Sequence, residues 1–300
     1  MKKLSIVVAT YNRSQSLLRT LRSVVRQTAP AEQWECVVVN NNSTDDTEAV
    51  FADFARENPT FDLRMVTETK QGLSNARNCG IEASVGDYIA FVVDDETLED
   101  SFAESYIEFF VSFPTAMAAG GAVKAGYESA RPRWMSRFTE QMIANPLDLD
   151  IAVTLFPQNR VPAGGNMAFR REVFDRVGLF NPQLGRNGKS LVGGEENDLF
   201  ARLRRAGELL YFVPNAAIFH HIPDSKLTDD YFDRLSYNVG VSKRLRAEAD
   251  GEVGKLLKSE SRKQVATYLL YVLYMLVLQP LKAKYLLRMR NGIYKGVKQL

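Results

Sequence analysis

Two kinds of segment alternate from Leu4 to Glu96. Short runs rich in β-branched residues have the length of buried strands, and the stretches between them repeat apolar residues at helical spacing, as Leu17, Leu21 and Val24 do. This alternation predicts an α/β fold with a mostly parallel sheet flanked by helices. The predicted strands are Leu4–Ala9, Trp34–Val39, Leu63–Thr67 and Tyr88–Val93, with Leu209–Val213 and Ala217–His221 later in the chain.

Polar clusters follow three of the predicted strands. They are Thr10–Arg13, Asn40–Asp46 and Asp94–Glu96. Ligands bind to open α/β sheets outside the carboxyl ends of the strands, so we expect the three clusters to converge on one crevice. The first strand is not followed by G-x-G-x-x-G, which argues against a dehydrogenase.

The acidic cluster Asp94–Glu96 is the sharpest local signal for chemistry. Three adjacent carboxylates at the end of an apolar strand repel one another unless a cation or strong hydrogen-bond donors compensate. A hard divalent ion with oxygen ligands would do so and would also neutralise a diphosphate leaving group. The alternative is a solvated turn whose acids cap a helix.

Two further segments suit a nucleotide. Asn40–Thr47 places short polar groups, including Asn40 and Asn42, where they could hydrogen-bond a base and ribose. Gly72–Asn78 opens a helix that carries Arg77, a cation suited to an anionic ligand. Taken singly, the first segment could be an ordinary strand–helix loop and Arg77 an ordinary surface residue.

Together these motifs resemble those of the family 2 glycosyltransferases, in the order and spacing of that family. The resemblance implies the GT-A fold and an inverting, metal-assisted transfer from a nucleotide-sugar, and it spans roughly residues 4–245. It divides the chain into a domain over 1–245, with a nucleotide-binding half (1–98) and an acceptor half (99–245), and a helical tail over 246–300. The segments that carry it are Ile6–Asn12, Val39–Thr47, Gly72–Asn78, Gly86–Phe91, Asp94–Asp95, Gly164–Arg170, Gly178–Phe180, Gly194–Leu199, Arg202–Gly207 and Pro214–His221.

The resemblance also implies a role for individual residues. Asp95 matches the metal-binding residue, with His221 as a second candidate ligand for Mn²⁺ or Mg²⁺, and Glu196 matches the catalytic base, with Glu195 beside it. Asn166 and Asp198 are the candidates for contact with the acceptor or donor sugar. The predicted nucleotide-binding residues are Thr10, Tyr11, Asn12, Asn40, Asn42, Arg77 and Asp94.

Three positions depart from the family pattern. Asn40 stands where most members carry Asp, and an amide both donates and accepts, so UDP is favoured by family habit while GDP and dTDP stay open. Val93 replaces the first of three consecutive acids, and Glu196 replaces the usual Asp and lengthens the base by one methylene.

The predicted reaction moves a sugar from the nucleotide-diphosphate donor to a hydroxyl of a saccharide or lipid-linked acceptor, in polysaccharide or glycolipid synthesis. A sugar nucleotidyltransferase is one alternative, although such enzymes usually carry a glycine-rich loop where this chain has Ala9–Arg13. A non-catalytic nucleotide-sugar-binding module is the other, favoured by Asn40 and Glu196. The formal charge of +2 gives no reason to expect a nucleic-acid partner.

The end of the chain has a composition of its own. Val265–Leu281 is uncharged, and from Lys282 onward there are six Lys or Arg residues and no acid. The run reaches only the lower edge of the ~17–25 residues that span a bilayer, so we expect it to lie on the cytoplasmic face of a membrane. The alternative is a helix packed on the domain or on another subunit, and an oligomer is possible. Cys36 and Cys79 have no metal or disulfide spacing, which suits the cytoplasm.

Overall fold

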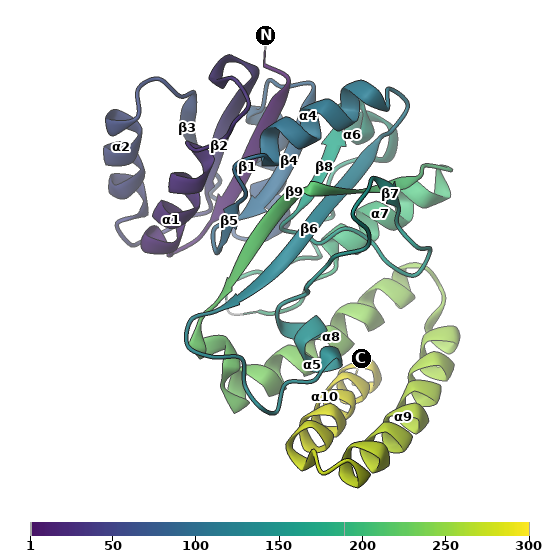
Figure 1. The fold of residues 1–300 in the computed structure, drawn as a ribbon. Coiled ribbons are helices and arrows are strands. Elements are labelled where there is room, and N and C mark those ends of the chain that lie inside the picture. The colour runs from purple at the N-terminus through teal and green to yellow at the C-terminus, as the bar shows by residue number, and fades with distance from the viewer. Residues whose placement is uncertain (1, 189, 300) are drawn as a thin grey trace. The chain divides into compact units, whose positions relative to one another are not determined.

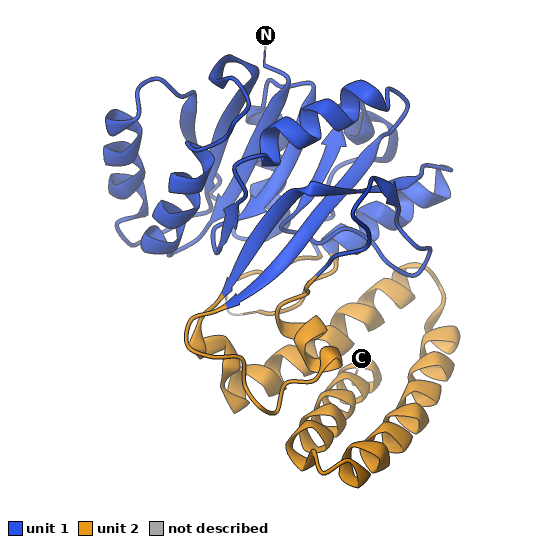
Figure 2. Ribbon diagram, viewed as in Figure 1, with its two compact units in different colours: residues 1–126, 147–183, 195–221 blue, residues 127–146, 184–194, 222–300 orange. Residues whose placement is uncertain are grey.

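The computed structural model describes residues 2–188 and 190–299, which form two compact units (Figure 2). Unit 1 comprises residues 1–126, 147–183 and 195–221, and unit 2 comprises residues 127–146, 184–194 and 222–300. The units are interleaved along the chain. The domain boundaries near residues 98 and 245 stay a prediction from the sequence.

Unit 1 is built on one mixed sheet with helices packed against it, which confirms the predicted α/β class (Figure 1). The strand order is β3-β2-β1-β4-β8-β6-β9-β5, and β7 pairs with β9. The strands are β1 Leu4–Thr10, β2 Trp34–Asn40, β3 Leu63–Thr67, β4 Tyr88–Val93, β5 Glu96–Leu98, β6 Ala118–Tyr127, β7 Thr154–Leu155, β8 Met167–Arg170 and β9 Leu210–Ile222.

Only part of this sheet is parallel. β1 pairs in parallel with β2 and β4, and β2 with β3, whereas β8 is antiparallel to both β4 and β6, and β9 to β5 and β7. The prediction of a mostly parallel sheet therefore holds for β1–β4, whose long crossovers contain helices, as parallel pairing requires. Past β4, the chain continues through antiparallel pairings, among them those of the long strands β6 and β9.

The helices of unit 1 bury their apolar faces against this sheet. Gly80 of α3 shows how closely one helix approaches, because a Cβ at this position would lie 2.4 Å from Cγ1 of Val7. Cys36 lies in the core, and burial raises the pKa of its thiol to about 12. The helices are α1 Ser14–Val24, α2 Thr47–Glu57, α3 Leu73–Ala83, α4 Phe102–Ser112, α6 Glu172–Val177 and α7 Glu195–Arg205, with a 3₁₀ turn at Ala31–Gln33.

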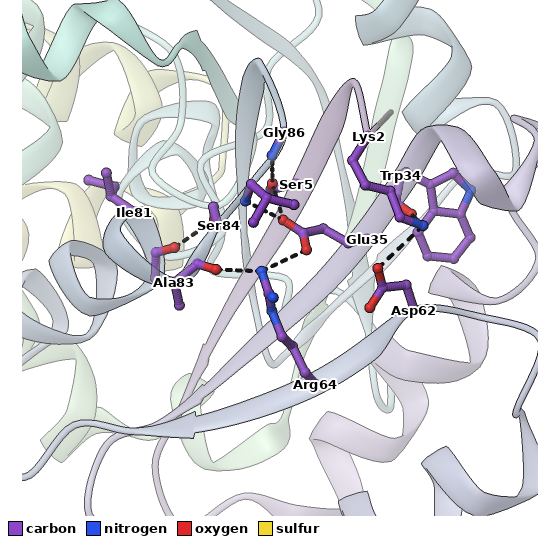
Figure 3. Close-up of polar contacts among 12 residues, drawn as sticks. Lys2, Ser5, Trp34, Glu35, Asp62, Arg64, Ile81, Ala83, Ser84 and Gly86 are labelled. Atoms are coloured by element: carbon purple, nitrogen blue, oxygen red, sulfur yellow. Dashed lines mark hydrogen bonds and ion pairs between the residues drawn. The ribbon is translucent and has the colours of Figure 1, made fainter.

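The amino ends of the parallel strands are joined by a buried carboxylate, Glu35 (Figure 3). Its Oε1 accepts hydrogen bonds from the Ser5 hydroxyl at 2.5 Å and the Val85 amide at 2.7 Å. Its Oε2 pairs with Nη2 of Arg64 at 2.7 Å. The Ser5 hydroxyl in turn accepts from the Gly86 amide at 2.9 Å. Both carboxylate oxygens of Glu35 are thus hydrogen-bonded to donors in the neighbouring strands and loops.

Unit 2 is helical, and its helices meet at glycines. A Cβ on Gly240 would lie 2.1 Å from the Ile293 carbonyl oxygen, and one on Gly296 would lie 2.1 Å from that of Tyr237. The backbones of α8 and α10 are therefore in direct contact. The helices are α5 Arg137–Ile143, α8 Asp229–Ala249, α9 Val253–Leu276 and α10 Pro280–Lys298, with a 3₁₀ turn at Asp224–Leu227.

A buried carboxylate also joins the long helices of unit 2. Glu260 of α9 pairs with Lys243 of α8 at 3.0 Å, Lys263 at 2.8 Å and Arg290 of α10 at 2.7 Å. Burial alone would raise the pKa of Glu260, but these cations hold it below its usual value. The first half of α9 is fixed by charge in this way.

The second half of α9 exposes a run of large apolar side chains. In the part of the chain that the structure describes, no helix has both the length and the apolar character needed to cross a bilayer. The exposed residues are Val265, Tyr268, Leu269, Val272, Leu273, Met275 and Leu276 of α9, then Val277 and Leu278 after its end and Leu281 at the start of α10. We call this set the apolar face of α9.

Candidate active site

The carboxyl ends of β1 and β4 bring a cation and two acids together. The hydroxyl of Thr10 donates to Oδ2 of Asp94 at 2.8 Å. Nη1 of Arg13 lies 3.0 Å from Oδ1 of Asp94 and 3.3 Å from Oδ2 of Asp95. Burial raises the pKa of Asp94, and the charge of Asp95 acts in the same direction, while Arg13 and the Thr10 hydroxyl oppose the rise. One guanidinium is therefore shared between two carboxylates.

Glu96, the third acid of this cluster, has a structural position. Its Oε2 accepts from the Val93 amide at 2.9 Å, and its carbonyl accepts from the Thr20 hydroxyl at 2.6 Å. Gly165 lies against its carboxylate, because a Cβ on that glycine would be 1.9 Å from Oε1 of Glu96. Glu96 therefore connects the end of β4 to the glycines that precede β8.

The loops after β1 and β2 are joined by asparagines. Oδ1 of Asn12 accepts from the backbone amide of Thr44 at 2.7 Å. The backbone amide of Asn12 donates to the Ser43 hydroxyl at 3.0 Å. Oδ1 of Asn40 accepts from the Ser43 amide at 3.0 Å. Asn12 and Asn42 have φ of +51° and +66°, in the left-handed region that asparagine tolerates better than most residues.

Asn41, which the sequence motifs alone did not single out, holds the approach to α3. Its Oδ1 accepts from the Gly72 amide at 2.8 Å, and its Nδ2 donates to the carbonyls of Glu68 and Lys70 at 2.9 Å each. Tyr11, by contrast, is exposed. The strand-end loops are thus built by Asn12, Asn40 and Asn41, while Tyr11 reaches solvent.

Arg77 of α3 lies inside the protein. Nη1 of Arg77 forms an ion pair with Oε1 of Glu195 at 2.6 Å, and Nη2 donates to the Gly164 carbonyl at 2.8 Å. The guanidinium carbon lies 5.3 Å from the centre of the Phe180 ring and 6.0 Å from that of Phe91. Only 3% of the Arg77 surface is exposed. This guanidinium joins α3 to the first residue of α7.

Glu196, the predicted base, is only partly buried. Its Oε1 accepts from Nδ2 of Asn197 at 2.6 Å. A Cβ on Gly164 would lie 3.7 Å from Cγ and 3.8 Å from Cδ of Glu196. Gly164 therefore adjoins Glu196, and the next residue, Gly165, adjoins Glu96. The structure brings the predicted base and Glu96, the last acid of the strand-end cluster, to neighbouring glycines within unit 1.

The two histidines at the end of β9 differ in their contacts. Nε2 of His221 is 2.9 Å from the hydroxyl of Thr97, and the His221 amide donates to the Asp95 carbonyl. Burial and the charge of Arg19 lower the pKa of His221, although Asp95 opposes this. The ring of His220 lies nearer to the acid, with Nε2 3.9 Å from Oδ2 of Asp95.

The side chains of this site can be compared with the ligands that a divalent cation requires. Among the described residues, no cluster of three or more His, Cys, Asp or Glu side chains is arranged to hold a metal. Asp94 and Asp95 nevertheless present carboxylates, the donors that Mn²⁺ and Mg²⁺ prefer, and Arg13 already places a positive charge between them. Asp94 and Asp95 are therefore the residues that would hold such an ion.

The family model described as Glycosyl transferase family 2 matches residues 5–178, a segment that contains β2–β4, all of β1 except Leu4, and the acidic cluster. The chain belongs to glycosyl transferase family 2. Among the curated relatives of this glycosyltransferase is the glucosyl-dolichyl phosphate glucuronosyltransferase of Haloferax volcanii. The two are 26% identical over 253 residues, which cover 81% of this chain and 77% of the relative.

Two further similarities agree with this membership. The succinoglycan biosynthesis protein ExoM of Rhizobium meliloti is 27% identical over 249 residues, which cover 82% of this chain and 75% of that protein. The mannosyltransferase PcManGT of Pyrobaculum calidifontis, solved with GDP-Man and Mn²⁺, has a TM-score of 0.63 at 18% identity, covering 97% of this chain and 86% of its own. The last similarity bears on the fold, and it confirms the expected GT-A architecture.

Two residues predicted to contact sugar in this glycosyltransferase have protein partners. Asn166 is buried. Its Nδ2 donates to the carbonyls of Ala122 and Ala216, and its Oδ1 accepts from the Tyr106 hydroxyl at 2.5 Å. Asp198 of α7 pairs with Arg202, one turn further along the helix. Contacts from Asn166 and Asp198 to a sugar stay a prediction.

Arg13 is the residue of this site that sequence reasoning overlooked. It belongs to the strand-end motif Thr10–Arg13, and it is a cation on a loop expected to face acids. The sequence could therefore have indicated the contact between Arg13 and the acids. The roles of Asn41 and Glu96 depend on loops that are distant in the sequence.

Proposed function

We propose that this glycosyltransferase catalyses an inverting transfer from a nucleotide-diphosphate donor to a hydroxyl group of a saccharide or lipid-linked acceptor, in polysaccharide or glycolipid synthesis. The observation that carries the proposal is the approach of Glu96, the residue after Asp94–Asp95, to Gly165 and of Glu196 to the adjacent Gly164, within the same unit that holds the acidic pair and Arg13. The names of the relatives support it, since one is named for a dolichyl phosphate substrate and one for succinoglycan biosynthesis.

The nucleotide would bind at the carboxyl ends of β1 and β2, where Thr10, Tyr11, Asn40 and Asn42 lie. UDP is the favoured base, with GDP and dTDP as the other candidates, because the Asn40 amide can pair with either donors or acceptors. A structure of the similar PcManGT contains GDP-Man, so the test includes guanine donors.

Asp95, with Asp94 beside it, would hold Mn²⁺ or Mg²⁺. When bound, the metal would neutralise the charge of the diphosphate as it leaves. His221 remains a candidate for a position near that group. Arg13 would move from its shared position between the acids or stay beside them as a further cation.

Glu196 would act as the base. Its carboxylate takes the proton of the acceptor hydroxyl as the hydroxyl oxygen bonds to the anomeric carbon, and the bond from that carbon to the diphosphate oxygen breaks on the opposite face. The released nucleoside diphosphate carries away the bonding electrons. This displacement inverts the configuration at the anomeric carbon.

The test is a panel of UDP, GDP and dTDP sugars, with and without manganese, in which release of nucleoside diphosphate is measured. Manganese-dependent release from one donor class supports the proposal. Formation of pyrophosphate from a sugar phosphate and a nucleoside triphosphate would identify a nucleotidyltransferase instead. Binding of a nucleotide-sugar without release, under all conditions, would identify a binding module.

We propose in addition that the protein is peripheral on the cytoplasmic face of a membrane, through the apolar face of α9. Residues 261–299 contain no acid, and Arg262, Lys263, Lys282 and Lys284 flank the apolar run in the sequence. Cations beside an exposed apolar helix face complement an anionic lipid surface. A second copy of the same segment would bring like charges together, so lipid is the occupant that the charges favour.

Vesicle co-sedimentation of the full chain tests this proposal. Binding to vesicles with anionic lipid should exceed binding to neutral vesicles and should fall when Leu269, Leu276 and Leu278 are replaced together by Gln. Unchanged binding by this variant would contradict the proposal, and a change in oligomeric state would indicate a protein partner instead. Leu209, an exposed leucine of unit 1, provides the control substitution.

A further inference from the structure

We propose that Arg77 is a positioning residue, which acts through Glu195 to hold the predicted base Glu196 in place. The inference rests on the function proposed above, and it replaces the nucleotide contact that the sequence suggests for Arg77. It starts from three features of the guanidinium: its burial, its two polar partners and its two aromatic neighbours.

The guanidinium of Arg77 already has polar partners at its edge and aromatic rings near its faces. Nη1 is paired with Glu195 and Nη2 with the Gly164 carbonyl, while the rings of Phe91 and Phe180 lie within cation–π distance. A nucleotide would have to compete with all of these contacts. Arg suits this position better than Lys, because its planar fork serves two acceptors in fixed directions and packs against rings.

Arg77 is the cation that pairs with Glu195 among the residues that the structure describes. Oε1 of Glu195 pairs with Arg77, whereas its Oε2 is buried and has no hydrogen-bond partner in the part of the chain that the structure describes. A buried carboxylate that loses its cation must take up a proton or move. Because Glu195 is the first residue of α7, such a movement would displace the start of the helix, where Glu196 lies.

Gly164 adds a second path from Arg77 to the base. Its carbonyl accepts from Nη2 of Arg77, and its Cα faces the Glu196 side chain, since a methyl group added to this glycine would touch that side chain. Arg77 therefore fixes the residue before Glu196 and the backbone beside Glu196 at the same time. Misplacement of a catalytic group by about 1 Å can lower a rate by ~10²-fold.

The experiment compares Arg77→Met with the wild type on the donor identified above. We expect kcat to fall by ~10²-fold, while the dissociation constant of the nucleoside diphosphate, measured by calorimetry with manganese, changes less than about threefold. Glu195→Gln, which keeps an acceptor for Arg77, should lose less activity than Arg77→Met.

Arg170 is the matched control. It also lies over two rings, those of Tyr88 and Phe110, and donates to backbone carbonyls, but no carboxylate is among these contacts. Arg170→Met should lower thermal stability without the ~10²-fold loss of kcat. If Arg77→Met behaves like Arg170→Met, Arg77 has only a structural role and the proposal is wrong.

Two other outcomes separate this proposal from the proposed function. A nucleotide affinity that falls at least tenfold in Arg77→Met with kcat retained would make Arg77 a nucleotide contact and overturn the positioning role alone. A wild-type protein that releases nucleoside diphosphate from no donor would refute the transfer reaction, and the positioning role with it.

Discussion

The two ends of the parallel strands both hold buried acids, but they use them differently. At the amino ends, Glu35 is a single carboxylate whose oxygens receive three donors, from Ser5, Val85 and Arg64 (Figure 3). At the carboxyl ends, Asp94 and Asp95 share one guanidinium. In the first arrangement both oxygens of one carboxylate accept hydrogen bonds, and in the second two adjacent carboxylates contact the same guanidinium.

This difference separates a structural acid from one prepared for a ligand. A buried carboxylate whose hydrogen bonds are all made adds to the cohesion of the strands and offers little to another molecule. Two adjacent carboxylates with a raised pKa at one of them favour the arrival of a cation. Substitutions at the two ends should therefore have opposite signatures.

Asp95→Ala should have the largest effect on activity. We expect it to abolish transfer and to remove the metal dependence of donor binding, while the free energy of unfolding changes by less than about 1 kcal/mol, because repulsion from Asp94 is relieved. Product formation and calorimetry with manganese measure the first two effects. Full activity in metal-free buffer would show that the acids at the carboxyl ends do not serve a metal ion, and the comparison would fail there.

Glu35→Ala should have the opposite signature. Removing the carboxylate leaves the buried Ser5 hydroxyl, the Val85 amide and the Arg64 guanidinium without their acceptor, which should lower the free energy of unfolding by about 3–5 kcal/mol. Urea unfolding measures this loss. The kcat of the folded molecules should stay close to wild type, and a selective loss of kcat at unchanged stability would show that this end takes part in function.

Glu196→Gln tests the second half of the site. The change is nearly isosteric, so donor affinity should survive while turnover falls by at least ~10²-fold, the scale of general-base loss. Initial rates and nucleotide calorimetry on the same preparation separate the two quantities. If Glu195→Gln is the inactive variant instead, the base is the residue before the one that we predict.

Arg13→Gln should have the smallest effect of these variants. It tests whether Arg13 supplies the charge that a metal ion would supply to the acids. Arg13 is partly exposed, so its contribution to stability should be about 0.5–1 kcal/mol in metal-free buffer. Saturating manganese should reduce the difference from wild type, because the metal supplies the same positive charge to the acids. Thermal unfolding in EDTA and in manganese measures both; an equal difference under the two conditions would mean that Arg13 and the metal act independently.

Local patterns in the sequence predicted the parallel part of the sheet well. The runs that became β1–β4 are rich in apolar and β-branched residues and are followed by polar residues, so their type and approximate boundaries could be predicted. Farther along, two strands expected at Leu209–Val213 and Ala217–His221 form one strand, β9, that continues through Pro214. Pairing with several partners decided this, against the local signal of a proline.

Single residues of the site could be predicted from the sequence, but the contacts between them could not. Asp94 and Asp95 drew attention as adjacent acids at the end of an apolar strand, and Glu196 through the resemblance to the family motif. The partner of Arg77 lies 118 residues away in the sequence, so no local pattern distinguishes a surface arginine from this buried one. The same limit applies to Glu96 and Gly165, whose close approach depends on the completed sheet.

The close contact between α8 and α10 limits which substitutions in the gene the protein would tolerate. Gly240, Gly292 and Gly296 sit where even a methyl group would meet the opposing helix at 2.1 to 2.5 Å. Glycine weakens a helix by about 1 kcal/mol relative to alanine, yet here alanine would force two backbones apart. A screen for conditional alleles should therefore find temperature-sensitive mutants at these three codons, through substitutions that helix propensity alone would rank as improvements.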